Sequence, residues 1–193
     1  MMISAPTISL LRDFVREKRG LAAIEFAILL PVMLIALLGA TDIEDGIAVS
    51  IKNAITARTV TDLVTQYQSI RWNDMTTLLN ASSQVIAPYS AANLTVRVSD
   101  VSIDQNTGVA TITWSRSLPA GSERATGSVV NLPVGMATNG THLIWGEVSY
   151  QYTPTVGYVL TNPITLTNQI FMSPRKSADV VLCTAGQVNC FTV

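Results

Sequence analysis

Residues 16–43 read REKRGLAAIEFAILLPVMLIALLGATDI, and this stretch decides how the chain is organised. Its basic beginning ends at Gly20, and residues 21–40 follow with one ionisable side chain, Glu25. As a helix, these residues would be about 30 Å long, which is the thickness of the hydrocarbon core of a bilayer. The stretch therefore predicts a membrane-spanning helix at 21–40, preceded by a short charged leader at 1–20.

The two flanks of the apolar segment differ in charge. Four basic side chains precede it, and three acidic ones follow it at Asp42, Glu44 and Asp45. Because basic flanks stay in the cytoplasm, we expect a cytoplasmic N-terminus and an outer C-terminal domain. In an oxidising compartment Cys183 and Cys190 can form a disulfide. The alternative is that both cysteines are unpaired and act as small hydrophobic side chains.

The helix is expected to continue past the membrane, because residues 42–68 contain no proline and one glycine. This part of the helix carries two apolar stripes at helical spacing. The first is Ile43, Ile47, Ile51 and Ala54, and the second is Val60, Leu63, Val64 and Tyr67. The stripes point in different directions. We therefore expect the first half to contact other subunits and the second half to contact its own domain. A break or bend near Ala57 is the alternative.

A second helix is predicted from Asp74, a suitable N-cap, to the residues before Pro88. Its apolar spacing indicates a face that covers a sheet: Met75, Leu78, Leu79, Ser82, Val85 and Ile86. Residues 41–90 are thus expected to form a helical stalk and this second helix.

From residue 93 the apolar period changes to two, which is typical of strands. We expect strands at 93–103, with a bulge near 99–100, and at 110–114, 143–152, 164–172 and 178–183, with 129–132 a candidate edge strand in a long loop. The predicted fold class is α+β: a long membrane-spanning helix continues into an outer domain, in which the second helix packs on an antiparallel sheet of about 4–5 strands (residues 91–193).

The chemistry-bearing residues do not form a recognisable catalytic pattern. His142 is the one histidine of the chain, which argues against a zinc site, and no nucleophile motif accompanies it. Residues 100–104, DVSID, resemble the D-x-S-x-S metal-adhesion motif of von Willebrand type A domains, but aspartate replaces its last serine and no βαβ order surrounds it. We interpret them as strand and turn. With a net charge of −1, nothing indicates nucleic-acid binding. We expect neither a metal nor a cofactor.

Glu25 is the residue that needs a chemical explanation. A carboxyl group costs about 2.5–3.5 kcal/mol at mid-bilayer, and less nearer the surface. Such a residue is by default functional and needs a partner. The alternative is that Glu25 reaches back to the headgroups near Lys18 or Arg19.

The run Gly20-Leu21-Ala22-Ala23-Ile24-Glu25-Phe26 resembles a prepilin processing site of the Flp/Tad type. Phe26 stands where the major Flp pilins commonly have tyrosine, a departure shared by the minor, TadE-like pseudopilins. The short basic leader, the membrane segment with Pro31 and the outer domain are also similar to TadE-like proteins. The C-terminal run MSPR at residues 172–175, ending near Cys183, also resembles the close of TadE-like proteins.

The resemblance implies that a membrane aspartyl prepilin peptidase cuts after Gly20 and leaves Leu21 as the new N-terminus. It also implies that Glu25 pairs with the freed N-terminal amine of an adjacent pilin or pseudopilin subunit. Pro31 cannot donate to the carbonyl of Ala27, so a helix kink is expected there. The chain would then lie in the bacterial inner membrane, with its outer domain in the periplasm.

Three functions remain open from the sequence. The first is a non-catalytic TadE-like pseudopilin that takes part in pilus assembly. The second is an uncleaved, membrane-tethered periplasmic binding module. The third is an exported hydrolase with an unrecognised site, which would need His142 or a cluster among four carboxylates: Asp100, Asp104, Glu123 and Glu147.

Overall fold

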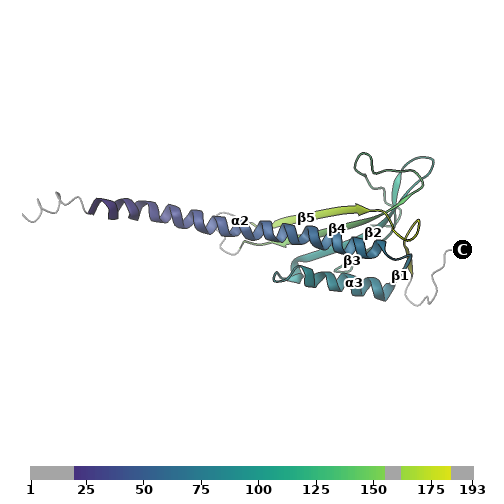
Figure 1. Cartoon of the computed structure of the whole chain (residues 1–193), viewed down its shortest axis with the longest axis horizontal. Coiled ribbons are helices and arrows are strands. Elements are labelled where there is room, and N and C mark those ends of the chain that lie inside the picture. The colour runs from purple at the N-terminus through teal and green to yellow at the C-terminus, as the bar shows by residue number, and fades with distance from the viewer. Residues whose placement is uncertain (1–19, 155–161, 184–193) are drawn as a thin grey trace, which may run out of the picture.

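The computed structural model describes residues 20–154 and 162–183. Its first element is the helix α2, Leu21–Thr65, 45 residues in length. Figure 1 shows its N-terminal half as a rod that projects from the domain and its C-terminal half packed on the sheet. The helix continues through Ala57, so a break there is wrong, while a bend there stays a prediction. Its N-terminal part is long and apolar enough to cross a membrane, which indicates membrane anchoring.

The sheet has four antiparallel strands in the order β3-β2-β4-β5. Their bounds are Leu94–Ile103 for β2, Ala110–Leu118 for β3, His142–Tyr152 for β4 and Ile164–Met172 for β5. α2 and the second helix α3, Trp72–Val85, both pack on one face of this sheet (Figure 1). The α+β class is therefore confirmed. The expected division of the chain at residues 20, 40 and 90 stays a prediction.

Three details of the helical region differ from the expectations. α2 ends at Thr65 rather than reaching 68. Asp74 lies in the first turn of α3, whose N-cap is Arg71, so the predicted cap is wrong. A carboxylate in that turn still favours the helix through the dipole. A short 3-10 helix, η2 (Ala91–Asn93), links α3 to β2.

A small parallel pair lies outside the main sheet. β1, Ser69–Arg71, pairs with β6, Val181–Cys183. β1 was not predicted, since three residues between two helices carry too little period-two pattern. β6 begins three residues later than expected. The pair brings the end of the described chain back to the end of α2.

The bulge lies in β3 rather than in β2. The pairing of β2 with β4 is regular along its length, whereas its pairing with β3 shifts between Asp100 and Val101. Asp100 faces Trp114 and Val101 faces Ile112, so Thr113 is the extra residue. The apolar phase of β2 changes for another reason: its far half buries Val101 and Ile103 in a second core on the other face of the sheet.

Two cores lie on the two faces of the sheet. The main core fills the space between both helices and the sheet, and it includes Val60, Val64, Met75, Leu79 and Val148. The second core lies on the other face and is covered by the β3–β4 loop: Val101, Ile103, Ala110, Ile112, Val130, Leu143 and Trp145. The candidate edge strand at 129–132 forms a single bridge, between Val129 and Thr111.

Candidate functional site on the long helix

The predicted processing residues lie at the exposed start of α2. Gly20 is the N-cap, with φ −76°, and a Cβ added there would meet nothing within 4 Å. The local structure therefore does not require glycine at this position. Glu25 and Phe26 lie on the exposed helix surface. Within residues 20–154 and 162–183, the Glu25 side chain forms neither a hydrogen bond nor an ion pair. Lys18 and Arg19 lie outside the described residues.

Pro31 is inside α2, and the helix runs through it without interruption. The kink expected there stays a prediction. The apolar side chains around it are largely exposed, which is unfavourable in water and suits a lipid or protein environment: Ile28, Leu29, Val32, Met33, Leu34, Ile35 and Leu37.

Beyond the apolar segment, α2 carries a row of four exposed isoleucines, spaced four residues apart. We call Ile43, Ile47, Ile51 and Ile55 the isoleucine ladder; they are 51%, 57%, 56% and 50% exposed. The first predicted stripe therefore faces away from the chain's own domain, as expected. Such a row is more apolar than an ordinary solvent-facing helix surface. Its contact with other subunits is untested.

The second predicted stripe is half right. Val60 and Val64 are buried in the main core, but Leu63 and Tyr67 are each 38% exposed. The face of α2 that packs on the sheet is instead largely made of small or polar residues that the apolar pattern missed: Asn53, Thr56, Ala57, Thr61 and Thr65. Their helical spacing was the signal that could have identified them.

Side-chain hydrogen bonds fix the helix on the sheet, and so set which face carries the ladder; one runs from Asn168 Nδ2 of β5 to the Ser50 carbonyl at 3.2 Å. Asn53 Nδ2 donates to the Leu166 carbonyl of β5 at 2.9 Å. The Tyr152 hydroxyl donates to the Asp42 carbonyl at 2.8 Å. These contacts begin next to the apolar segment, so the domain holds α2 from Asp42 onward.

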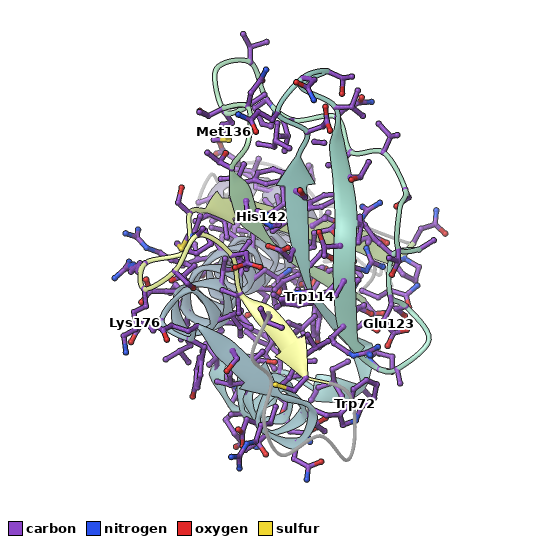
Figure 2. The ribbon with its side chains drawn as sticks, turned by 90° about the vertical axis from the view of Figure 1, so that its right-hand side faces the viewer. Trp72, Trp114, Glu123, Met136, His142 and Lys176 are labelled. Atoms are coloured by element: carbon purple, nitrogen blue, oxygen red, sulfur yellow. The ribbon has the colours of Figure 1, made fainter. Side chains whose placement is uncertain are left out.

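The MSPR run at residues 172–175 holds the other end of α2. The Arg175 backbone N–H donates to the Thr65 carbonyl at 2.9 Å, and its guanidinium pairs with Asp62. Gln68 Nε2 donates to the Lys176 carbonyl at 3.1 Å. Figure 2 shows Lys176 on the helix side of the domain. The run therefore acts as a cap for the carbonyl end of the helix, which would otherwise lack partners.

The carboxylates of the hydrolase hypothesis have separate structural roles. Asp104 accepts bonds from the Asn106 and Thr107 backbone in its turn. Glu123 accepts from the Gly121 N–H, and Glu147 binds two arginines. Asp100 lies beside His142, with 2.8 Å between Oδ2 and Nδ1. These residues do not converge on one site.

His142 begins β4, and its side chain is 24% exposed (Figure 2). Its buried partner was not predicted, because residues from separate strands meet only through the register. In the part of the chain that the structure describes, no three His, Cys, Asp or Glu side chains could hold a metal ion. Cys183 is buried, while Cys190 lies outside the described residues, so their disulfide stays a prediction.

Burial raises the pKa of Asp100 from its ordinary value of 3.8, while His142 and Thr113 oppose this. A raised pKa in the folded state means that this group favours folding below about pH 4 and that the contribution falls as the pH rises through the folded-state pKa. We therefore expect Asp100→Asn to remove a decrease in stability that the wild type shows as the pH rises above about 4. Urea unfolding of both chains across this range measures it.

Asp104 provides the control, because its turn hydrogen bonds lower its pKa from 3.8. Its contribution is present above that value and lost as the pH falls further, so Asp104→Asn should lower stability by a constant amount above about pH 4, and this difference from the wild type should shrink at lower pH. If the wild type and Asp100→Asn have parallel stability profiles above pH 4, the role of Asp100 is contradicted.

The comparisons with known proteins agree with the helix as the principal site. The family model described as "TadE-like protein" matches residues 20–57. No curated protein and no solved structure matches the chain. The matched range contains the processing residues, the apolar segment and the whole isoleucine ladder, and it confirms the resemblance to TadE-like proteins.

Proposed function

We propose that this TadE-like chain is a non-catalytic minor pseudopilin that takes part in the assembly or priming of Flp/Tad-type pili for adhesion or secretion. The family match to residues 20–57 suggests a role in Tad pilus assembly, and TadE-like pilus proteins are structural. The observation that carries the proposal is that this matched helix leaves its ladder uncovered by its own domain. An exposed apolar row next to a membrane segment fits a subunit that packs against others.

In this proposal, residues 1–20 lie in the cytoplasm and the domain lies in the periplasm, bound to the inner membrane by residues 21–40. The basic leader and the acidic residues after the segment support this orientation. A membrane aspartyl prepilin peptidase cuts after Gly20. The open surroundings of Gly20 support this. The fold itself does not require glycine at this position, whereas the substrate groove of a peptidase would require a residue without a side chain.

The cut frees the Leu21 amine, and Glu25 pairs with this amine of an adjacent pilin or pseudopilin. The exposed position of Glu25, without an ion-pair partner among the described residues, supports this role. In a low-dielectric bundle an ammonium and a carboxylate stabilise each other, whereas either alone is penalised. The pair would set the axial register between subunits.

Two variants separate processing from assembly. We expect mass spectrometry of the purified wild type to show a mature N-terminus at Leu21, and Gly20→Val to retain the leader. Glu25→Gln should be cut normally but lower assembly at least tenfold, since loss of one partner of a buried pair costs about 3–5 kcal/mol. Pilus counts and co-purification with other pilus subunits measure this.

Glu44→Gln is the control for the second variant, because Glu44 is exposed on the same helix outside the apolar segment. It should assemble normally. An intact leader on the wild type would favour the uncleaved binding module. Normal piliation in Glu25→Gln would contradict the charge pair.

A further inference from the structure

The face of the sheet turned away from both helices has a polar pocket of about 390 Å³. It lies on the half of the sheet nearest the apolar segment, beside the second core rather than inside it. Every lining residue is polar, and we call this set the outer pocket: Thr95, Arg97, Ser122, Glu147, Ser149 and Thr167. None of these residues belongs to the helix site.

Three hydroxyl side chains form a row across the floor of the outer pocket. In the sheet register Thr95 of β2 is opposite Ser149 of β4, and Ser149 is opposite Thr167 of β5. Neighbouring strands are about 4.8 Å apart, so the hydroxyls are spaced at about that interval. Each hydroxyl can both donate and accept. The row therefore matches a ligand that itself carries several hydroxyl groups.

The next row carries charge, and positive charge is in excess. Glu147 accepts from Arg97 Nη1 at 3.2 Å, and from Arg124 Nη2 and Nε at 2.7 and 2.8 Å. Two guanidinium groups thus surround one carboxylate, whose side chain is 11% exposed. Arg97 Nε also donates to the Ser122 carbonyl. Neither bond of Arg97 uses Nη2, so part of its donor fork is available for another acceptor.

We propose that the outer pocket binds the carboxylate of a hydroxyl-rich ligand, namely an acidic sugar such as a uronic acid residue. Arg97 would bind the carboxylate, and the hydroxyl row would bind the ring hydroxyls. One excess positive charge matches a single carboxylate, and the polar side chains of the lining favour a polar ligand. The pseudopilin proposal assigns no ligand here, so the two are independent.

The affinity is expected to be low. Sugar sites often use an exposed aromatic ring, but here the nearby Trp145 is buried. Arg124 lies 4.1 Å from its ring centroid, and Phe171 stacks on it with 5.2 Å between centroids. Binding therefore depends on hydrogen bonds and one charge in an open pocket. We expect a dissociation constant of order 1 mM for a monosaccharide.

The test is a titration of the full chain, in detergent micelles, with sodium galacturonate. Binding is measured by saturation-transfer NMR. We expect galactose and acetate to bind at least tenfold more weakly, because each lacks half of the recognised groups. Thr167→Val should weaken galacturonate binding roughly 2- to 10-fold, which is the value of one hydrogen bond. Arg97→Lys should weaken it further, since a point charge cannot replace the guanidinium fork.

Thr165→Val is the matched control, because Thr165 is two residues away on the same face of β5 and outside the pocket. It should leave binding unchanged, and thermal unfolding should confirm that all three variants are folded. The proposal is overturned if galacturonate shows no transfer at about 20 mM. It is also overturned if galactose binds equally well, or if Thr165→Val weakens binding as much as Thr167→Val.

Discussion

Replacing Gly146 by alanine is expected to lower the free energy of unfolding by about 1–3 kcal/mol. Gly146 is in the middle of β4 on the face that contacts α2. A Cβ there would lie 1.8 Å from Thr61 Oγ1, 3.1 Å from Thr61 Cβ and 3.2 Å from the Ala57 carbonyl oxygen. The side chain of Thr61 cannot simply move aside, since its hydroxyl donates to that same carbonyl at 2.6 Å.

The sign of this effect is the informative part. Alanine in place of glycine usually stabilises a strand or helix, because it reduces the freedom of the unfolded chain. Gly46 supplies the matched control: it lies inside α2, and its added Cβ would be 3.5 Å from Tyr152, an ordinary contact. Gly46→Ala should therefore stabilise the protein by up to about 1 kcal/mol.

Urea unfolding of the full chain in detergent compares these variants. Adding Thr61→Ala to Gly146→Ala should recover part of the loss, because it removes the Oγ1 contact but leaves Cβ and the helix backbone close. Equal destabilisation by Gly146→Ala and Gly46→Ala would contradict close packing at this crossing. So would a Gly146→Ala variant as stable as the wild type.

The same crossing shows why part of the fold could not be read from the sequence. Long apolar periodicity predicted α2, α3 and the main strands, with β5 at its observed bounds. The sequence does not reveal that α2 packs on the sheet through Thr61 and Asn53. An apolar pattern does not identify buried polar residues, whose burial depends on hydrogen bonds such as that of Asn53 to another element. Nor does a lone glycine in a strand reveal which helix approaches it.

The candidate sites divide in the same way. The exposed stripe of Ile43, Ile47 and Ile51 was predictable because its spacing lies within one helix, whereas the roles of Gly20 and Glu25 stay predictions. The Asp100–His142 contact and the outer pocket were not, because strand register brings their residues together from separate strands. The shift at Asp100 was expected, but its extra residue is in the partner strand, where period-two reasoning applied to one strand cannot place it.

Replacing Ile47 and Ile51 together by lysine is expected to abolish incorporation into pilus assemblies while leaving the domain folded. Both side chains are more than half exposed, so their replacement removes little buried area from the monomer. In an assembly, burying the exposed part of each isoleucine would contribute about 1 kcal/mol, and a lysine in its place would add an unpaired charge. Co-purification with other pilus subunits and pilus counts measure the loss.

Val134→Lys is the control, because Val134 is fully exposed on the β3–β4 loop, away from α2. It should assemble as the wild type does. Unfolding midpoints of both variants should match the wild type within the error of the measurement. Normal piliation with both ladder lysines would contradict the docking role, even if Glu25 proved essential.

The spacing of the ladder also predicts the geometry of its partner. Each four-residue step advances about 40° around the helix axis, so the row winds around α2 between Ile43 and Ile55 rather than running straight. A helix lying parallel to α2 would contact only part of it. A partner whose own four-residue ridges fill the grooves beside this row would cross at about 50°.

Cysteines placed at Ile43 and Ile55 should therefore crosslink to different faces of a partner helix. Crosslinking of both to one straight stripe would indicate a parallel bundle instead.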